Sequence, residues 1–367
     1  MTSSAEELAA LRDSVRGVLA SRGTEADVRA VMETPSGYEP SLWQQLAGLG
    51  IAGLIVPAQY GGSGAGPVEL ETVMEEAGAA LLCSPLLGSS VLAAAVLIES
   101  GDGAAQAALL PPVAAGTGIV AAAITGPGGQ WTADGVAVTA AESAGGWTLD
   151  GTADYVIGGQ NAGTLLVAAR ERAGITWFVV APEDAEVTAL PAFDHTLRLA
   201  RVRLSGAPAM PLGERGAGWA AAERALNLAR VALAGEQAGG ARRSLDITVA
   251  YSKVRVQFGR PIGSFQAIKH LAADLLLEAE SAISAARHAA RELAAGSAGA
   301  QLAVDLAAFA CADAFTTVAA ASVQMHGGIA FTWDHPAHLY LRRARADAQL
   351  LGTPSFYRER YVQQLGG

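Results

Sequence analysis

A series of short runs rich in β-branched and alternating apolar residues lies between two long helical stretches, and this order limits the possible folds. The runs are separated by turns rich in glycine, aspartate and asparagine, which is typical of strands in one compact sheet. We expect strands at 119–124, 136–142, 147–158, 164–170, 176–182 and 200–206. Strands bounded on both sides by helical blocks predict a small β-barrel or sandwich inserted between helical domains.

The flanking stretches have the 3.6-residue apolar period of helices. Upstream, we expect helices over Ala5–Ala20, Ser41–Leu49 and Pro67–Gly78. Ser41 is a plausible N-cap of the second helix, and the third should carry Glu71, Glu75 and Glu76 on its solvent face. Downstream, long helices rich in alanine and leucine predict a four-helix bundle. Their expected ranges are 217–252, 262–295, 299–326 and 336–349.

The predicted fold class is therefore α+β, in three consecutive domains. These are an N-terminal helical domain over 1–115, a middle β domain over 116–213 and a C-terminal bundle over 214–367. Helices this apolar in an acidic protein favour an oligomer, because a second apolar face needs burial.

Charge and cysteine content exclude several function classes. The net charge is −10 and the sequence pI is about 5.1, which argues against nucleic acid and against anionic membranes. The two cysteines, Cys83 and Cys311, are too few for a disulfide framework and predict reduced core thiols in a cytoplasmic protein. The uncharged window 77–98 is long enough to span a bilayer, but Ser84-Pro85 and Gly88 interrupt it, so we expect no membrane span.

A candidate anion site lies between Tyr251 and Asp274. The pattern predicts a helix, a tight turn and a second helix, with Arg255 and Gln257 close to the start of the second helix. A guanidinium, an amide and free helix N–H groups together suit a pyrophosphate.

This segment resembles the flavin-contacting segment of the acyl-CoA dehydrogenase family, which has the pattern R-x-x-F-G-x-x-I-x-x-F-Q. The matching residues here are Arg255, Phe258, Gly259, Ile262, Phe265 and Gln266. A second segment resembles the family's Q-x-x-G-G-x-G turn at Gln324, Gly327 and Gly328, with Ala330 in place of the last glycine. The resemblance implies that both segments contact the FAD of a neighbouring subunit, the second one at its adenosine.

The resemblance also implies contacts to substrate and flavin elsewhere. Asn227 and Arg230 match the family's L-D-x-x-R helix beside the acyl chain and CoA, although a structural ion pair is an equal alternative for Arg230. Tyr155 stands where the family stacks an aromatic ring on the flavin, and Thr353 matches the family's threonine after the base.

Neither usual position of the family's catalytic carboxylate holds an acid in this chain. Leu351 and Ala229 occupy the two positions. Glu236, two helical turns after Ala229, is a candidate base, with a structural pairing to Arg242 or Arg243 as the alternative. The histidines show no metal-ligand spacing, so no metal site is predicted.

The absence of an acid at both usual positions favours one hypothesis about the function over two others. The chain resembles the base-lacking subunit of heteromeric actinobacterial acyl-CoA dehydrogenases of the steroid side-chain type. It would act on an acyl-CoA with a homologous catalytic subunit in a heterotetramer, and would be inactive alone. The alternatives are a homo-oligomer that uses Glu236, and a scaffold subunit without flavin.

Overall fold

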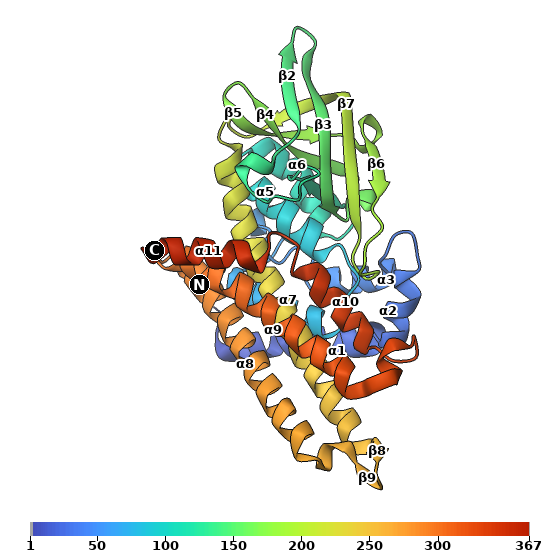
Figure 1. The fold of residues 1–367 in the computed structure, drawn as a ribbon. Coiled ribbons are helices and arrows are strands. Elements are labelled where there is room, and N and C mark those ends of the chain that lie inside the picture. Colours follow the sequence, from blue (N-terminus) through green and yellow to red (C-terminus); the bar gives the residue numbers. More distant parts are fainter. Residues whose placement is uncertain (1–2, 367) are drawn as a thin grey trace. The chain divides into compact units, whose positions relative to one another are not determined.

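The computed structural model describes residues 3–366, and its helices and strands follow the predicted order of helices, strands and helices (Figure 1). The chain forms two compact units, and neither is a continuous stretch. The first unit contains 1–29, 67–82 and 230–367, and the second contains 30–66 and 83–229. These two units do not correspond to three consecutive domains, so the domain boundaries at 115 and 213 remain a prediction from the sequence.

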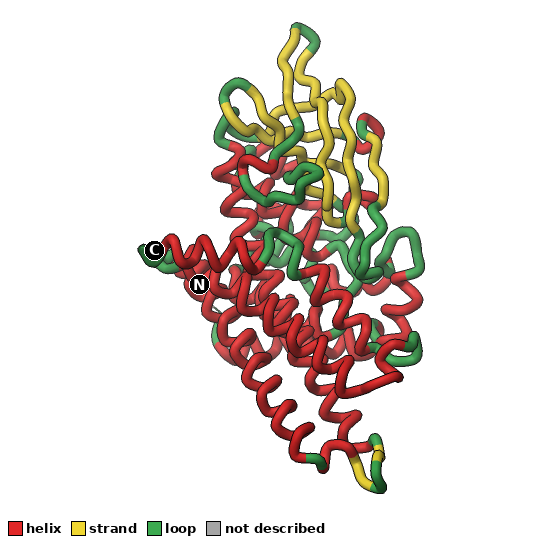
Figure 2. Tube along the Cα trace, in the orientation of Figure 1, coloured by secondary structure: helices red, strands yellow, loops and turns green. Residues whose placement is uncertain are grey.

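The strands of the second unit close into a small barrel (Figure 2). They are β1 (Val120–Ala123), β2 (Thr139–Ser143), β3 (Gly146–Ile157), β4 (Thr164–Glu171), β5 (Gly174–Val180), β6 (Glu186–Ala189) and β7 (Leu199–Leu212). Around the ring, β4, β2, β3, β7 and β5 are neighbours in that order, and β5 pairs again with β4. The sequence missed the short strand β6, which pairs antiparallel with the first part of β7, from Ala200 to Arg203.

Strict alternation along β7 explains why its residues form a barrel strand. Ala200, Val202 and Leu204 are buried, whereas Arg201 and Arg203 between them are exposed. Successive side chains of a strand point to opposite faces, so one face enters the core and the other meets solvent. Phe178 and Trp147 meet in this core with ring centroids 5.2 Å apart.

The helices of the second unit are α3 (Pro40–Gly48), α5 (Ala94–Glu99) and α6 (Gly103–Ala114), with a π-helix over Leu86–Ala93. The expected cap of α3 was wrong. The N-cap is Glu39, two residues before Ser41, and its carboxylate accepts from Ser41 N–H. Pro40 takes the first helical position, because the fixed φ of proline suits the start of a helix. The helix α2 (Glu25–Met32) precedes α3.

The uncharged window 77–98 is a broken and buried segment. It consists of the end of α4 (Pro67–Ala79), a turn, the π-helix and part of α5. A Cβ on Gly88 would lie 2.7 Å from the carbonyl oxygen of Ile157, so the π-helix packs closely on the barrel. One described segment, Ala300–Phe331, is long and apolar enough to cross a membrane, and half of its most apolar window is buried in the structure.

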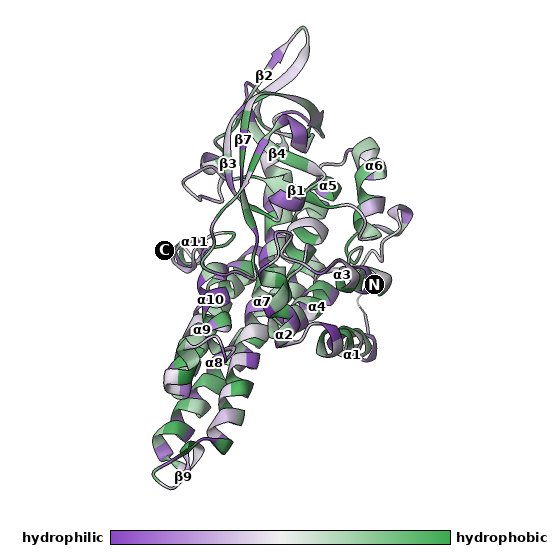
Figure 3. Ribbon diagram, turned by 90° about the vertical axis from the view of Figure 1, so that its right-hand side faces the viewer, coloured by the Kyte–Doolittle hydropathy of each residue, from purple (hydrophilic) through white to green (hydrophobic). Residues whose placement is uncertain are grey.

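Four helices correspond to the predicted C-terminal bundle: α7 (Gly218–Val254), which begins in the second unit, α8 (Gln266–Ala295), α9 (Ala300–His326) and α10 (Ala337–Asp347). The first unit also contains α1 (Ala5–Arg22), α4 and α11 (Pro354–Gln364). The sequence did not predict α11. Small residues such as Ala286 and Ala307 fill the contacts, and hydrophobic residues run along α7, α8 and α9 beside hydrophilic ones (Figure 3).

Glycines bring α4 and α7 into backbone contact. A Cβ on Gly239 would lie 1.8 Å from the carbonyl oxygen of Glu75, and one on Gly78 would lie 1.9 Å from that of Glu236. Gly235 meets Glu71 in the same way, at 2.8 Å from its carbonyl oxygen. Only glycine permits so close a crossing, because any other residue would place a carbon inside a carbonyl group.

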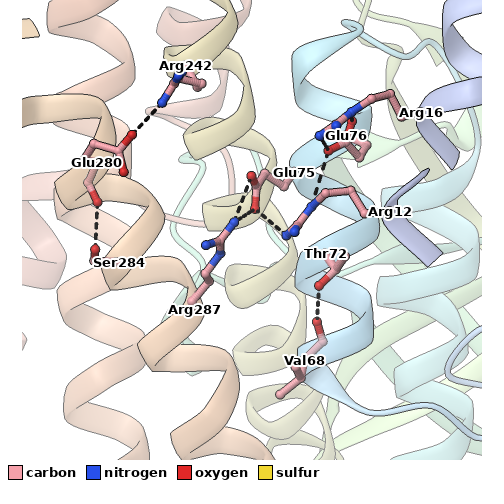
Figure 4. A network of polar contacts seen from close by, with 10 residues as sticks. All are labelled: Arg12, Arg16, Val68, Thr72, Glu75, Glu76, Arg242, Glu280, Ser284 and Arg287. Atoms are coloured by element: carbon pink, nitrogen blue, oxygen red, sulfur yellow. Dashed lines mark hydrogen bonds and ion pairs between the residues drawn. The ribbon is translucent and has the colours of Figure 1, made fainter. Parts of the chain in front are cut away.

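The expected solvent face of α4 was wrong, because this close crossing turns its acids inward. Glu71 and Glu76 are buried, at 2% and 6% exposure. Figure 4 shows the result: Arg16 donates to Glu76 at 2.9 and 2.7 Å. Arg287 donates to Glu75 at 2.9 Å. Burial, and then the charge of neighbouring Glu75, raise the pKa of Glu71 to about 8.

Gly239→Ala should destabilise the protein by about 3 kcal/mol or more, because the methyl group forces α4 and α7 apart. Gly17→Ala in α1 is the matched control, since a Cβ there meets nothing within 4 Å. A helical alanine in open space should stabilise the fold by roughly 0.5–1 kcal/mol. Urea unfolding of both variants measures the difference, and equal stabilities would contradict the close crossing.

The raised pKa of Glu71 predicts a stability that falls as pH rises. The unfolded carboxyl releases its proton near 4.5 and the folded one near 8, so the native state binds more protons between these values. The free energy of unfolding should decline there by up to about 1.4 kcal/mol per pH unit. Glu71→Gln should remove this decline, while Glu278→Gln on the exposed face of α8 should keep it. Thermal unfolding from pH 5 to 8 provides the test; parallel curves for wild type and Glu71→Gln would count against it.

Candidate functional site

The end of α7 and the start of α8 present a cation and open helix N–H groups. The hairpin strands β8 (Val256–Gln257) and β9 (Arg260–Pro261) join the two helices, and Ile262 N–H donates to the carbonyl oxygen of Arg255 at 2.8 Å. The side chain of Arg255 is exposed. Phe265, at the N-cap of α8, makes no side-chain cap bond, so the first N–H groups of a long helix remain available for an anion.

The other predicted residues of this segment lie on the same exposed hairpin. Phe258 is 92% exposed with a φ of +52°, and Gly259 follows at +75°. Gln257 donates to the carbonyl oxygen of Val256 at 2.9 Å, and Gln266 lies 3.4 Å from His270. The sequence missed Arg260, whose guanidinium lies 4.1 Å from the centroid of the Phe265 ring. Its position directly before a proline in a hairpin gave no clear signal.

The second predicted segment is a glycine turn at the end of α9. Gly327 has a φ of +66° and a ψ of −143°, a conformation that glycine alone adopts readily. Gly328 and the preceding Gln324 are exposed. The turn therefore offers accessible backbone and an amide side chain, as recognition of a nucleotide requires.

An aromatic stack brings these two segments together. Tyr251, one turn before Arg255, lies with its ring centroid 4.5 Å from that of His326, the last residue of α9. The His335 ring contacts His326 with centroids 4.2 Å apart and planes tilted by 47°. Burial lowers the pKa of both histidines, which favours neutral rings that contact each other without charge repulsion. The sequence was searched for histidines only as metal ligands, and this link between the two segments was missed.

Leu351, which the sequence comparison with the family's motif predicts to occupy the usual base position, is apolar and buried. Leu351 is fully buried with a φ of +60°. The Tyr357 hydroxyl donates to its carbonyl oxygen, and Arg230 Nε donates to that hydroxyl at 2.8 Å. Arg230 is itself 3% exposed, and its guanidinium lies 5.3 Å from the centroid of the Tyr357 ring. No carboxylate at position 351 is available to accept a proton.

Glu236 is held in a buried ion pair. Arg343 on α10 donates to its carboxylate, and both side chains are under 9% exposed. The pairing partner is Arg343 rather than the expected Arg242, which donates instead to Asp246 at 3.1 Å. A carboxylate committed to a buried guanidinium is poorly placed to take a proton from a substrate.

The remaining predicted residues lie in varied settings. In the second unit, Tyr155 has a φ of +57° and a 37% exposed ring, beside an Asp154–Arg201 pair with bonds of 2.6 and 2.7 Å. Asn227 is half-buried and Ala229 is buried. In the first unit, the Thr353 hydroxyl caps α11 by accepting from Phe356 N–H at 3.3 Å.

Backbone strain coincides with three of these positions. The described non-glycine residues with positive φ are Leu81, Tyr155, Phe258 and Leu351. Such residues cost about 1–3 kcal/mol each and gather at functional sites. The chemistry of the exposed set fits the nucleotide part of a flavin, since it joins a guanidinium, an open helix start and a glycine turn. Within the described residues no cluster of histidine, cysteine, aspartate or glutamate could hold a metal.

Comparisons with known proteins agree with this geometry. Residues 216–365 match the family described as acyl-CoA dehydrogenase, C-terminal domain, and residues 5–117 match its N-terminal domain. The chain is 35% identical over 352 residues to "Acyl-CoA dehydrogenase IpdE2" of Mycolicibacterium smegmatis, covering 95% of this chain and 96% of that protein.

Two solved structures have a similar fold. A variant of the "Tcur3481-Tcur3483 steroid ACAD" is 31% identical with a TM-score of 0.88, covering 98% of both chains. The ChsE4-ChsE5 complex from Mycobacterium tuberculosis is 29% identical with a TM-score of 0.90, covering 99% of this chain and 98% of that one. With both terminal domains matched and near-complete coverage by relatives above 30% identity, the chain belongs to the acyl-CoA dehydrogenase family.

Proposed function

We propose that this chain is a subunit of a heteromeric, FAD-dependent acyl-CoA dehydrogenase whose homologous partner supplies the catalytic carboxylate. The observation that carries the proposal is the contrast between two sites. The Arg255 hairpin and the Gly327 turn are exposed and suited to a nucleotide, whereas position 351 holds a buried leucine.

Each residue set has a distinct role in this proposal. Arg255 and the start of α8 would bind the FAD pyrophosphate through charge and N–H donors, and the turn at Gly327 and Gly328 would receive the adenosine. The flavin, when bound, supplies the hydride acceptor for oxidation of the acyl-CoA. Removal of the substrate proton needs a carboxylate. Leu351 cannot provide it, and Glu236 is paired with Arg343, so the proton acceptor would come from the partner.

The names of the relatives suggest the substrate class and the assembly. The titles of the similar structures describe a steroid enzyme and a two-protein complex. We therefore assign to this chain an acyl-CoA with a steroid-derived acyl group and a homologous partner subunit. A heterotetramer and a cytoplasmic location are further parts of the proposal; the location agrees with a chain whose two cysteines are both buried and free. The acidic net charge of −10 agrees with a role apart from nucleic acids.

Turnover with and without the partner tests the proposal. The chain should be expressed alone and together with a homologue that retains the base, and assayed with acyl-CoAs and ferrocenium as electron acceptor. We expect turnover only in the complex, and its loss by at least 10³-fold when the partner's glutamate becomes glutamine. Turnover by this chain alone that Glu236→Gln abolishes would defeat the proposal, and a colourless complex that does not take up added FAD would indicate a flavin-free scaffold.

Removal of the exposed cation should weaken cofactor binding. Arg255→Ala in the complex should raise the Kd for FAD about tenfold or more, since a charge-assisted hydrogen bond contributes roughly 1.5–3 kcal/mol. Arg172→Ala, at an exposed arginine of the barrel, is the matched control and should leave the Kd unchanged. Flavin fluorescence titration of the apo complex gives both values, and equal affinities would remove Arg255 from the cofactor site.

A further inference from the structure

A continuous chain of buried hydrogen bonds joins α7, α11 and the loop between α10 and α11. Arg230 Nε donates to the Tyr357 hydroxyl at 2.8 Å, and this hydroxyl donates to the carbonyl oxygen of Leu351. Arg230, Tyr357 and Leu351 are exposed by 3%, 2% and 0%. Buried polar groups bonded to one another hold their elements firmly, since breaking one bond leaves its partners without water.

The loop is held in a conformation that it would not adopt by itself. Leu351 has a φ of +60°, a left-handed conformation that disfavours a side chain with a Cβ. Gly352 follows with a φ of +122°, and a Cβ there would lie 2.4 Å from the Tyr357 hydroxyl oxygen. The hydroxyl therefore occupies space that only glycine leaves open. Such strain persists where the surroundings over-determine the backbone, and the bond from the Tyr357 hydroxyl is one of the contacts that hold Leu351 in this conformation.

The space around these residues is too small for a substrate. A cavity lined by Arg230, Leu351 and Tyr357 has a volume of about 10 Å³, enough for a single water molecule. Its other lining residues are Leu233, Gln237, Ala308, Asp347, Leu350 and Gly352. A space that holds one water molecule leaves no room beside Leu351 for the reacting carbons of an acyl-CoA.

We infer that Arg230 and Tyr357 are positioning residues that lock the loop at 350–353 and close the acyl position of this chain. Arg230 then serves the loop rather than the substrate. This inference rests on the proposed function, because closure matters only where a partner performs the dehydrogenation. We call the hydrogen bonds from Arg230 to Tyr357 and from Tyr357 to Leu351 the clamp. In this inference the clamp keeps the Leu351 side chain at the position where relatives would carry a base.

Amide hydrogen exchange of the full chain tests the clamp. Tyr357→Phe removes the hydroxyl that bonds to Leu351, so exchange at 350–353 should rise at least tenfold while α8 and α9 stay protected. Tyr361→Phe is the matched control, one turn further along α11, where the ring packs against Phe309 at 5.7 Å. It should leave the loop unchanged. A purely structural role would instead raise exchange across the whole bundle.

A second variant and a ligand-protection experiment test the same closure of the loop at 350–353. Arg230→Lys, which loses the Nε donor but keeps the charge, should raise loop exchange in the same direction if Tyr357→Phe does not fold. In the complex, an acyl-CoA that the complex turns over should protect the partner and leave 350–353 of this chain unaffected. Unchanged exchange in the folded variants, or protection of this loop by that acyl-CoA, would overturn the closure. The turnover assay is independent of both, so the proposed function can fail or stand separately.

Discussion

The contact between α4 and α7 is the constraint on which the first unit depends. Gly78, Gly235 and Gly239 let the two helix backbones touch where any other residue would place a carbon within 3 Å of a carbonyl oxygen. Helices so close leave no layer of side chains between them. The acids of α4 then face arginines from α1 and α8, and Glu71 remains buried with its pKa raised to about 8.

The same crossing fixes the setting of Glu236. Its backbone lies against Gly78, and its carboxylate pairs with Arg343 from α10. A buried pair is costly to break because either partner alone would be an uncompensated charge. The sequence allowed Glu236 as a base because it lies in an apolar helix. In the structure its carboxylate instead links α7 to α10 through the ion pair with Arg343.

The two ends of the candidate site differ in their accessibility. At the end proposed to bind the nucleotide, Arg255 and Gly328 are exposed, and the contact between the Tyr251 and His326 rings links their segments. At the end proposed to lack a base, Leu351 and Arg230 are buried and bonded through Tyr357. This difference in exposure is the observation behind the proposal that the chain shares a cofactor with a partner.

The sequence by itself determined the order of helices and strands, the alternation of β7 and the absence of an acid at positions 229 and 351, because these depend on local pattern and identity. It did not determine which acids of α4 are buried, the partner of Glu236 or the role of Arg230. These depend on which helices meet and how closely, and residues such as Arg343 and Tyr357 lie more than a hundred positions from their partners. Only the tertiary structure decides such pairings, since burial and charge compensation arise when distant segments pack together.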